Sequence, residues 1–507
     1  MFRALFTVGS LTFLSRILGF VRDLVLAHSF GANAATDAFF VAFKIPNFFR
    51  RLFAEGAFAT AFVPVLSEYK ERRTVEELRH FINHLTTALG GVLLAVTLVG
   101  VVFAPWIIVL FAPGFIGDGE KQQLASEMLR ITFPYLLLIS LAAFAGSILN
   151  TYGRFGPPAF APVLLNISLI VAALWFAPTL EQPVVALAWG VLLAGVLQLL
   201  FQLPFLQRLR LLPRPALNTR DEGVRRVILL MVPALFAVSV TQINLLLDTV
   251  IASFLESGSI SWLYYSDRLM EFPLGILGVA LGTVILPYLS ARHAEESSTR
   301  FSHALDWALR WVLFLGLPAA LGLMLLAGPI LATLFQSDHF TPRDVEMASL
   351  SLIAYGSGLL SFIAIKVLAP GYFSRQDTKT PVRIAVIAMS VNMLLNLLLV
   401  FPLAHAGLAL ATALSATLNA WLLYRGLRRE GVYQPQPGWR LRILHGVLAS
   451  AVMALVIYGL MGEWASWLVM GRSEKILLLL GIITAAAVSY GAVLFACGVR
   501  PRMLLRP

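Results

Sequence analysis

The residues at 56–67, GAFATAFVPVLS, are matched by VALGTVILPYLS at 279–290, an offset of 223 positions. Both stretches are apolar, contain small residues and close on Pro, an apolar residue, Leu and Ser. A second pair, LNTYGR at 149–154 and GYFSR at 371–375, lies at an offset of about 221. A repeat of this length predicts two similarly folded halves.

The surrounding composition is that of a membrane protein, since 59% of the 507 residues are apolar and only 13% are charged. A helix needs about 20 apolar residues to cross a bilayer. The sequence then predicts fourteen spans, near 3–27, 34–66, 82–111, 125–149, 158–178, 184–206, 226–254, 259–290, 303–335, 344–371, 382–401, 407–427, 441–461 and 475–497.

The repeat organises these spans. Six spans separate the two copies, so the halves share their orientation in the membrane. We expect an all-α polytopic protein with two six-helix lobes related by pseudo-two-fold symmetry. The N-lobe covers 1–206, the C-lobe 207–429, and two extra helices occupy 430–507.

The distribution of Lys and Arg between the loops predicts the orientation of the chain in the membrane. With the N-terminus inside, 25 of the 38 Lys and Arg residues fall in inner segments and four in outer loops, among them Lys121. Positive residues concentrate on the cytoplasmic side of membrane proteins, so both termini should be cytoplasmic. This topology also accounts for the net charge of +11 without a nucleic-acid partner.

No catalytic motif stands out. Cys497 is the only cysteine, which excludes an intramolecular disulfide, and no phosphate-binding loop or metalloprotease motif is present. No loop is long enough for a nucleotide-binding domain. We therefore expect a transporter rather than an enzyme, driven by a gradient, a membrane potential or a partner.

Nine cations fall inside the predicted spans, where each costs roughly 2.5 to 3.5 kcal/mol at mid-bilayer. They are Arg16, Arg22, Lys44, Arg50, Arg51, Arg130, Arg268, Arg310 and Lys366. Such residues normally face an aqueous cavity or a charged ligand, so the cavity should be cationic and its cargo an anion.

Each of these charges has a structural alternative, an internal ion pair or a side chain that reaches the headgroups. We favour that alternative for Arg51, which has Glu55 at i+4, and for Arg130 and Arg310. A ligand role is favoured for Arg16, Arg22 and Arg268. Guanidinium groups bind phosphate oxygens through paired hydrogen bonds, so a diphosphate is a good match.

The charges gather on the first two spans of each half, which should face one another across a cleft between the lobes. Arg16 and Asp23 are seven residues apart, as are Asp37 and Lys44, so each pair shares a helical face. Arg268 and Glu271 lie at i and i+3.

Several motifs resemble the MurJ (MviN) family of lipid II flippases, which belongs to the multidrug, oligosaccharidyl-lipid and polysaccharide (MOP) exporter superfamily. They are SRILGFVRD at 15–23, FGA at 30–32, TDAFFVAFKIPN at 36–47, FAEGAF at 53–58, AFVP at 61–64 and DRLMEFP at 267–273. The resemblance runs over essentially the whole chain.

The resemblance implies a fourteen-helix bundle in the bacterial inner membrane that moves lipid II from the inner to the outer leaflet by alternating access. The residues implied to line or gate the cavity are Arg16, Arg22, Asp23, Asp37, Arg50, Arg268, Ser15, Ser261 and Glu271. The last two spans match those that form the family's lateral groove, which is expected to hold the lipid tail. The implied partners are lipid II, membrane lipids and cell-wall synthesis proteins. The protein itself is expected to be a monomer.

No cofactor is implied, but the family is associated with membrane potential and with a sodium site. The matching positions are Asp248, Asn392, Asn396 and Thr412. Oxygen donors suit a hard cation. A cluster of interhelical hydrogen bonds is an equally good interpretation.

Rival functions stay open at this point. A polysaccharide-precursor flippase of the same superfamily would also need cations for a diphosphate, and only the motifs distinguish it. A multidrug antiporter for organic cations would need an acidic, aromatic cavity instead. A lipid-carrier transferase or polymerase would need a catalytic acid and a metal in an outer loop, where the acids are scattered.

Overall fold

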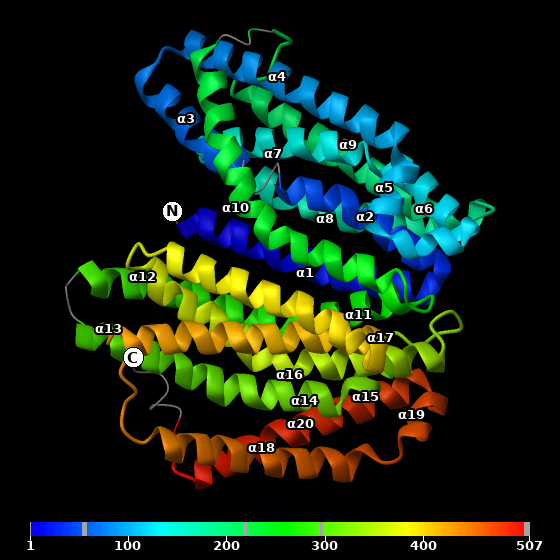
Figure 1. The fold of residues 1–507 in the computed structure, drawn as a ribbon, viewed down its shortest axis with the longest axis vertical. Coiled ribbons are helices and arrows are strands. Elements are labelled where there is room, and N and C mark those ends of the chain that lie inside the picture. Colours follow the sequence, from blue (N-terminus) through cyan, green and yellow to red (C-terminus); the bar gives the residue numbers. More distant parts are fainter. Residues whose placement is uncertain (1, 53–57, 217, 219–220, 295–297, 501–507) are drawn as a thin grey trace. The chain divides into compact units, whose positions relative to one another are not determined.

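The computed structural model describes all residues except 1, 53–57, 217, 219–220, 295–297 and 501–507. The described residues form helices and connecting segments, with no strand among them (Figure 1). This confirms the all-α prediction. The chain forms two compact units, Met1–Ser261 and Trp262–Pro507.

The first unit holds ten helices among its described residues. They are α1 (Phe2–Phe30), α2 (Ala34–Arg50), α3 (Ala59–Arg72), α4 (Val75–Val102), α5 (Ala104–Phe111), α6 (Gly119–Thr132), α7 (Tyr135–Thr151), α8 (Gly156–Val171), α9 (Val185–Arg208) and α10 (Glu222–Ala252). Short turns of other helix types follow α5 and α8, namely η2 (Pro113–Gly117), η3 (Ala172–Phe176) and η4 (Ala177–Thr179).

The second unit begins within α11. Its elements are α11 (Ser259–Pro273), η5 (Leu274–Gly278), α12 (Val279–Ala294), α13 (Ser298–Trp311), η6 (Val312–Gly316), α14 (Leu317–Leu325), α15 (Ala327–Leu334), α16 (Pro342–Phe373), α17 (Lys379–Arg429), α18 (Trp439–Met461), α19 (Trp464–Val469) and α20 (Arg472–Ala496).

Every predicted span falls on one helix or on a run of consecutive helices. The eleventh and twelfth spans share the 51-residue α17, which breaks at Ala404 (φ 46°, ψ −128°). Close packing accompanies the break, because a Cβ at Gly407 would overlap the carbonyl of Leu399. Prediction and structure therefore agree on two membrane crossings within this one stretch.

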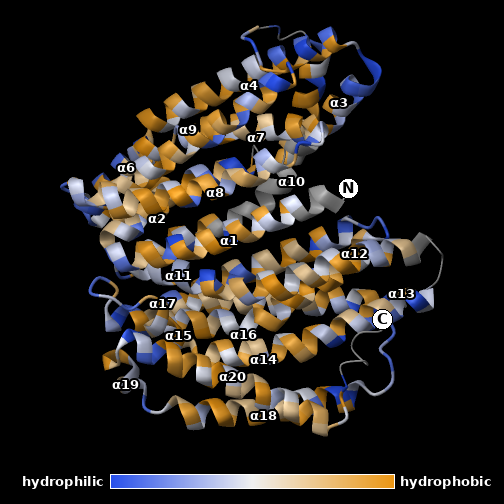
Figure 2. Cartoon of the chain, turned by 180° about the vertical axis from the view of Figure 1, so that it is seen from behind, coloured by the Kyte–Doolittle hydropathy of each residue, from blue (hydrophilic) through white to orange (hydrophobic). Residues whose placement is uncertain are grey.

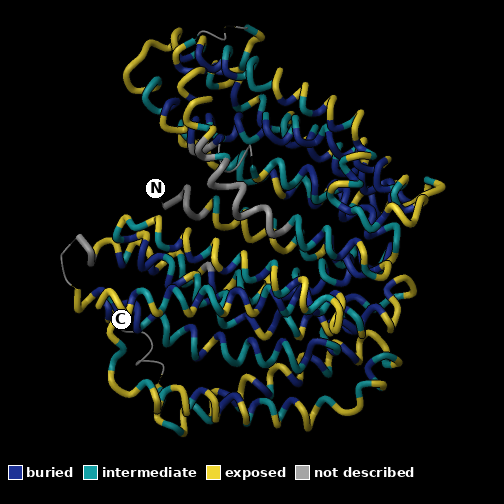
Figure 3. The backbone as a smooth tube through the Cα atoms, in the orientation of Figure 1, coloured by how far each residue is buried: buried dark blue, intermediate teal, exposed yellow. Residues whose placement is uncertain are grey.

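The surface is suited to lipid. Within the described residues, ten helical stretches are long and apolar enough to cross a membrane. Helix α4 exposes large apolar side chains such as Val92, Leu98 and Val102. The hydropathy and burial of the chain along its helices are drawn in Figures 2 and 3. Exposed apolar surface on this scale fits a hydrocarbon environment rather than water. The protein is a multi-pass membrane protein.

The sequence repeat of 223 positions is also seen in where the helices begin and end. Shifting α5 by 223 positions gives the bounds of α15, and shifting the N-cap Asp118 of α6 gives Thr341, the N-cap of α16. The turn after α7 has positive φ at Gly153, and the turn after α16 has it at Gln376, again 223 positions on. The two copies thus share local geometry well beyond the matched sequence.

The compact units do not coincide with the predicted lobes at α10. Val224 and Val227 of this helix join the buried core of the first unit, packed with Phe62 and Phe81 of α3 and α4. Gly223 lies against Phe81, where a Cβ would clash with the ring. In the second unit, α18 and α20 pack around Ile457, Trp467 and Leu479. The lobe division at 206 and 429 stays a prediction from the repeat.

Candidate functional site

Arg22 is the buried cation of the first helix, with 8% of its surface exposed. Its Nε and Nη2 donate to Oδ1 of Asp23 at 3.0 and 2.7 Å, and Nη1 donates to Oδ1 of Asn166 at 3.0 Å. Asn166 in turn donates to the carbonyl of Ser15 at 2.9 Å. A guanidinium and a carboxylate are therefore held together inside the membrane-spanning part of the first unit.

Asn166, on α8, is a residue that sequence reasoning missed. It lies 144 positions from Arg22, and the signal that could have found it is an Asn within an otherwise apolar span. Its amide fixes the guanidinium through the oxygen and helix α1 through the nitrogen. Arg16, predicted to act beside Arg22, is exposed.

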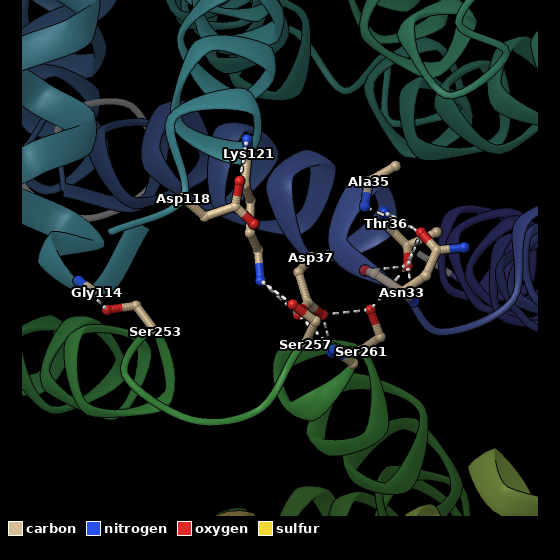
Figure 4. A network of polar contacts seen from close by, with 11 residues as sticks. Asn33, Ala35, Thr36, Asp37, Gly114, Asp118, Lys121, Ser253, Ser257 and Ser261 are labelled. Carbon is tan, nitrogen blue, oxygen red and sulfur yellow. Dashed lines mark hydrogen bonds and ion pairs between the residues drawn. The ribbon is translucent and has the colours of Figure 1, made fainter. Parts of the chain in front are cut away.

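A second group of polar contacts surrounds the buried Asp37 (Figure 4). One carboxylate oxygen accepts from the backbone N and the hydroxyl of Ser261 at 2.9 and 2.7 Å. The other accepts from the backbone N of Gly258 at 2.7 Å and pairs with Nζ of Lys121 at 3.2 Å. Asp37 and Ser261, both predicted to line or gate the cavity, are thus joined directly, and four donors stabilise one buried carboxylate.

Local sequence explains why Asp37 stands there. Asn33 caps α2 by accepting from the backbone N of Ala35 and Thr36, and the Thr36 hydroxyl accepts in return from the backbone N of Asn33. This capping box starts the helix and places Asp37 in its first turn. The carboxylate then meets the first turn of α11, where backbone N–H groups lack helical partners and a negative charge is favourable.

Lys121 was also missed as a site residue. The sequence predicted an outer-loop cation, but the structure places it in the first turn of α6 with 6% of its surface exposed. Its Nζ reaches Ser257 at 3.3 Å as well as Asp37, and it lies over the ring of Phe115. Only the placement in a loop was wrong, because the short polar segment from Asp118 to Gln122 reads as a loop although α6 begins there. The placement on the outer side stays a prediction.

Two further contacts tie α10 and the segment after it to the first six helices. Lys44 donates to the hydroxyl of Thr249 at 2.8 Å. The backbone N of Gly114 donates to the hydroxyl of Ser253 at 3.0 Å (Figure 4). Arg50 of α2 donates from Nε to Asn47 at 3.1 Å. Sequence analysis had related Lys44 only to Asp37.

In the second unit, Arg268 is paired with Glu271 at 2.6 Å and lies over the ring of Tyr264, 5.0 Å from its centroid. Both charged side chains are partly accessible, Glu271 the more so. The predicted pair at i and i+3 is therefore formed. It leaves the guanidinium at an accessible surface within an apolar helix.

The predicted sodium ligands lie in both units. Asp248 belongs to α10 in the first unit, while the others belong to α17 in the second. Asn396 donates to Oδ1 of Asn392 at 3.1 Å, and Asn392 donates to the hydroxyl of Thr412 at 3.4 Å. These three residues form one hydrogen-bonded chain between the two halves of α17. The four-residue site stays a prediction.

Four cations of the predicted spans remain, namely Arg51, Arg130, Arg310 and Lys366. Arg310 pairs with Asp306 at 2.6 Å, which is the internal ion pair that the structural alternative requires. Arg130 and Lys366 are exposed. The proposed partner of Arg51, Glu55, lies outside the described residues.

Chemically, the arrangement offers guanidinium groups set in apolar helices, each with a carboxylate neighbour. It also offers a carboxylate, Asp37, that holds three segments together. No group of three or more His, Cys, Asp or Glu side chains that could hold a metal is found in the part of the chain that the structure describes. Guanidinium groups in such surroundings are suited to contact an anion.

Known proteins resemble the chain along nearly all of its length. A family model described as lipid II flippase MurJ matches residues 26–478. A probable lipid II flippase MurJ of Vibrio cholerae is 51% identical over 500 residues, covering 97% of this chain and 95% of that protein. Lipid II flippase MurJ of Burkholderia cenocepacia is 47% identical over 470 residues, covering 92% and 90%.

Solved structures of known proteins are also similar to this chain. One described as lipid II flippase MurJ in an inward closed conformation has a TM-score of 0.81 and 28% identity, and the match covers 97% of this chain and 99% of that one. An inward-facing transporter of the MATE family, in the MOP superfamily, has a TM-score of 0.67 and 17% identity over 82% and 95%, which shows a shared fold. The chain belongs to the MurJ family.

Proposed function

We propose that this protein flips lipid II, the undecaprenyl-diphosphate-linked disaccharide-pentapeptide, from the inner to the outer leaflet of the bacterial inner membrane. The observation that carries the proposal is the 51% identity, over 97% of the chain, to a probable lipid II flippase. On this proposal the protein is a transporter and needs no catalytic residue.

The diphosphate is the part of the cargo that the intramembrane cations suit. A guanidinium keeps its charge when buried and offers paired N–H groups to phosphate oxygens. Arg22 is pre-organised by Asp23 and Asn166, and Arg268 lies at an accessible surface. We assign both, with Arg16 and Arg50, to a cationic cavity that receives the diphosphate during alternating access.

Asp37 has a different part in this proposal. It joins α2, α6 and the segment from Gly258 to Ser261 through one carboxylate. With the termini in the cytoplasm, this end of the first unit faces the outside. The network then acts as an outer closure, which must open before the cargo can leave.

We propose membrane potential as the driving force, with Asp248, Asn392, Asn396 and Thr412 as a sodium site that couples to it. The support is the chain of oxygen-bearing side chains on α17. A purely structural role for this polar cluster is the competing account.

The rival within the superfamily is export of another polyprenyl-diphosphate-linked saccharide or of drugs. A drug antiporter for organic cations is disfavoured by the arginines in the first two spans. Lipid II is favoured over other saccharides by the named relatives.

Complementation tests the proposal. A bacterial host is depleted of its own lipid II flippase while this chain is expressed, and lipid II in the outer leaflet is measured together with survival. We expect growth and normal outer-leaflet lipid II. Lysis with normal amounts of the protein in the membrane would overturn the assignment.

A further inference from the structure

A polar cavity lies in the second unit where α15 ends, α16 begins and α19 leads into α20. Its volume is about 440 Å³, within the range of ligand sites in proteins. The lining combines Lys475 and Arg472 with Thr333, Gln336, Asp338, Thr341 and a few apolar side chains. None of these residues belongs to the site proposed for the cargo.

Lys475 is the unusual member of this lining, since only 6% of its surface is exposed. Its Nζ donates to Oε1 of Gln336 at 2.8 Å, and Nε2 of Gln336 donates to the carbonyl of Leu468 at 2.8 Å. The second bond fixes the amide so that its oxygen faces the ammonium. Among the described residues, no carboxylate pairs with Lys475 within 4.0 Å.

An ammonium group has three N–H donors, and this one makes a single hydrogen bond to the protein. Burying a charge is costly unless it is paired. Lys475 lines the cavity, so an anion placed there would supply the missing partner. If the only role of Lys475 were to bond Gln336, a neutral hydrogen-bond donor would do so without the cost of burying a charge.

The lining holds a second cation, Arg472, and one acid, Asp338. Arg472 is exposed at the cavity and opens α20, while Thr341 caps the start of α16, so two positive helix ends meet the same space. The nearby Asp344 is bound to Thr341 and to the indole of Trp262.

Apolar side chains are exposed on the segments that carry Arg472 and Lys475. Val469 and Leu477, on either side of Arg472, are 85% and 71% exposed, and Leu480 one turn further along α20 is 56% exposed. These side chains offer a path for acyl chains beside a cationic pocket, which a free phosphate would not need.

We propose that this cavity binds the phosphate group of an anionic lipid headgroup, with Lys475 and Arg472 as its cationic contacts and α20 as the support for the acyl chains. The site is separate from the cationic cavity proposed for the diphosphate and does not depend on the proposed function. The charge distribution of the loops places it on the outer side of the membrane.

The test uses the purified full-length protein in detergent, titrated with dioleoyl-phosphatidylglycerol and followed by native mass spectrometry. Lys475→Gln should weaken phosphatidylglycerol binding about tenfold, because it removes a charge-assisted hydrogen bond. Arg472→Gln should weaken it less, since its side chain is exposed. Arg343→Gln removes a cation near the same helix start but outside the lining, and should leave binding unchanged.

Inorganic phosphate distinguishes the two sources of the anion. Competition by millimolar phosphate in the parent, lost in Lys475→Gln, would show that the phosphate group alone is recognised. No competition, with lipid binding still dependent on Lys475, would show that the acyl chains contribute.

Equal phosphatidylglycerol binding by the parent, Lys475→Gln and Arg472→Gln would overturn the proposal. Should Lys475→Gln not elute as a folded protein in gel filtration, the exposed Arg472 carries the comparison with Arg343 alone.

Discussion

In each repeat, a residue at the start of the fourth span bonds to a residue of the second span, and we call each of these two contacts a tie. The two ties differ in chemistry. In the first repeat Lys121 of α6 pairs with Asp37 of α2. The equivalent position 223 residues on is Asp344 of α16, which accepts from the indole of Trp262 on α11 at 2.9 Å. The first tie also holds Gly258 and Ser261, whereas the second lies within its own repeat.

The difference suggests that the same position serves two purposes. The Lys121–Asp37 pair needs two buried charges, and separating them would be costly unless water or other partners replace the contact. The Trp262–Asp344 bond joins a neutral donor to a carboxylate that already caps α16. On the proposed transport cycle, the first tie is the one that would open, because it joins segments of both repeats, and the second, which lies within one repeat, is fixed structure.

The first helices of the two repeats show the same contrast in sequence. Arg22 and Asp23 of α1 correspond to Leu245 and Leu246 of α10. Conversely, Asn392 and Asn396 of α17 correspond to the apolar Leu169 and Ala173 in the first repeat. A common helical framework thus carries a buried Arg–Asp pair in one copy and a neutral polar cluster in the other.

The largest effect is expected from Arg22→Ala. It removes the buried guanidinium and leaves Asp23 and Asn166 without this donor, so flipping should be abolished. Insertion should persist, because loss of a cation favours a membrane-spanning helix. Arg22→Lys should restore activity in part, and Arg130→Ala, an exposed cation of α6, is the control. Outer-leaflet lipid II is measured at equal membrane amounts, and full activity of Arg22→Ala would contradict its role.

Cross-linking the outer closure comes next. The hydroxyls of Thr36 and Ser261 lie 3.1 Å apart, so a Thr36→Cys, Ser261→Cys pair in a Cys497→Ser background is placed to form a disulfide. Oxidation should stop flipping and reduction should restore it, while each single cysteine variant stays active. Continued transport by fully cross-linked protein would show that this tie does not open.

Asp37→Asn and Asp344→Asn compare the two ties directly. The first leaves Lys121 buried without its counter-charge and should lower the free energy of unfolding by about 3 kcal/mol. The second retains an oxygen acceptor for Trp262 and should cost about 1 kcal/mol. Melting temperatures of the purified variants measure both. Adding Lys121→Met to Asp37→Asn should recover part of the loss, and equal effects of the two single variants would remove the contrast.

The smallest effect is expected at the polar cluster of the second repeat. If Asp248, Asn392, Asn396 and Thr412 bind sodium, Asp248→Asn should abolish sodium stimulation while basal flipping remains. Flipping is compared in sodium and in potassium buffers of equal ionic strength. Equal rates in the two buffers for the parent chain would make the cluster a structural one.

The fold was largely accessible from the sequence, because apolar length and spacing are local properties. The spans were predicted without knowledge of the turns within them, such as the break between α14 and α15 at Leu326. Such breaks depend on packing against neighbouring helices. The polar contacts were accessible only in part: Asp37, Ser261, Arg268 and Glu271 were singled out from the sequence and lie in such contacts, whereas Lys121 and Asn166 were not singled out.

By itself, the sequence determined the helical membrane class, the repeat at 223 positions and the family, since each is written in hydropathy or in contiguous motifs. Tertiary structure alone decided which charges meet. Lys121 and Asp37 are 84 positions apart, and Ser261 and Asp37 are 224 apart. A charge buried in an apolar bundle must find its partner in space, and a partner so distant along the chain leaves no local pattern to read.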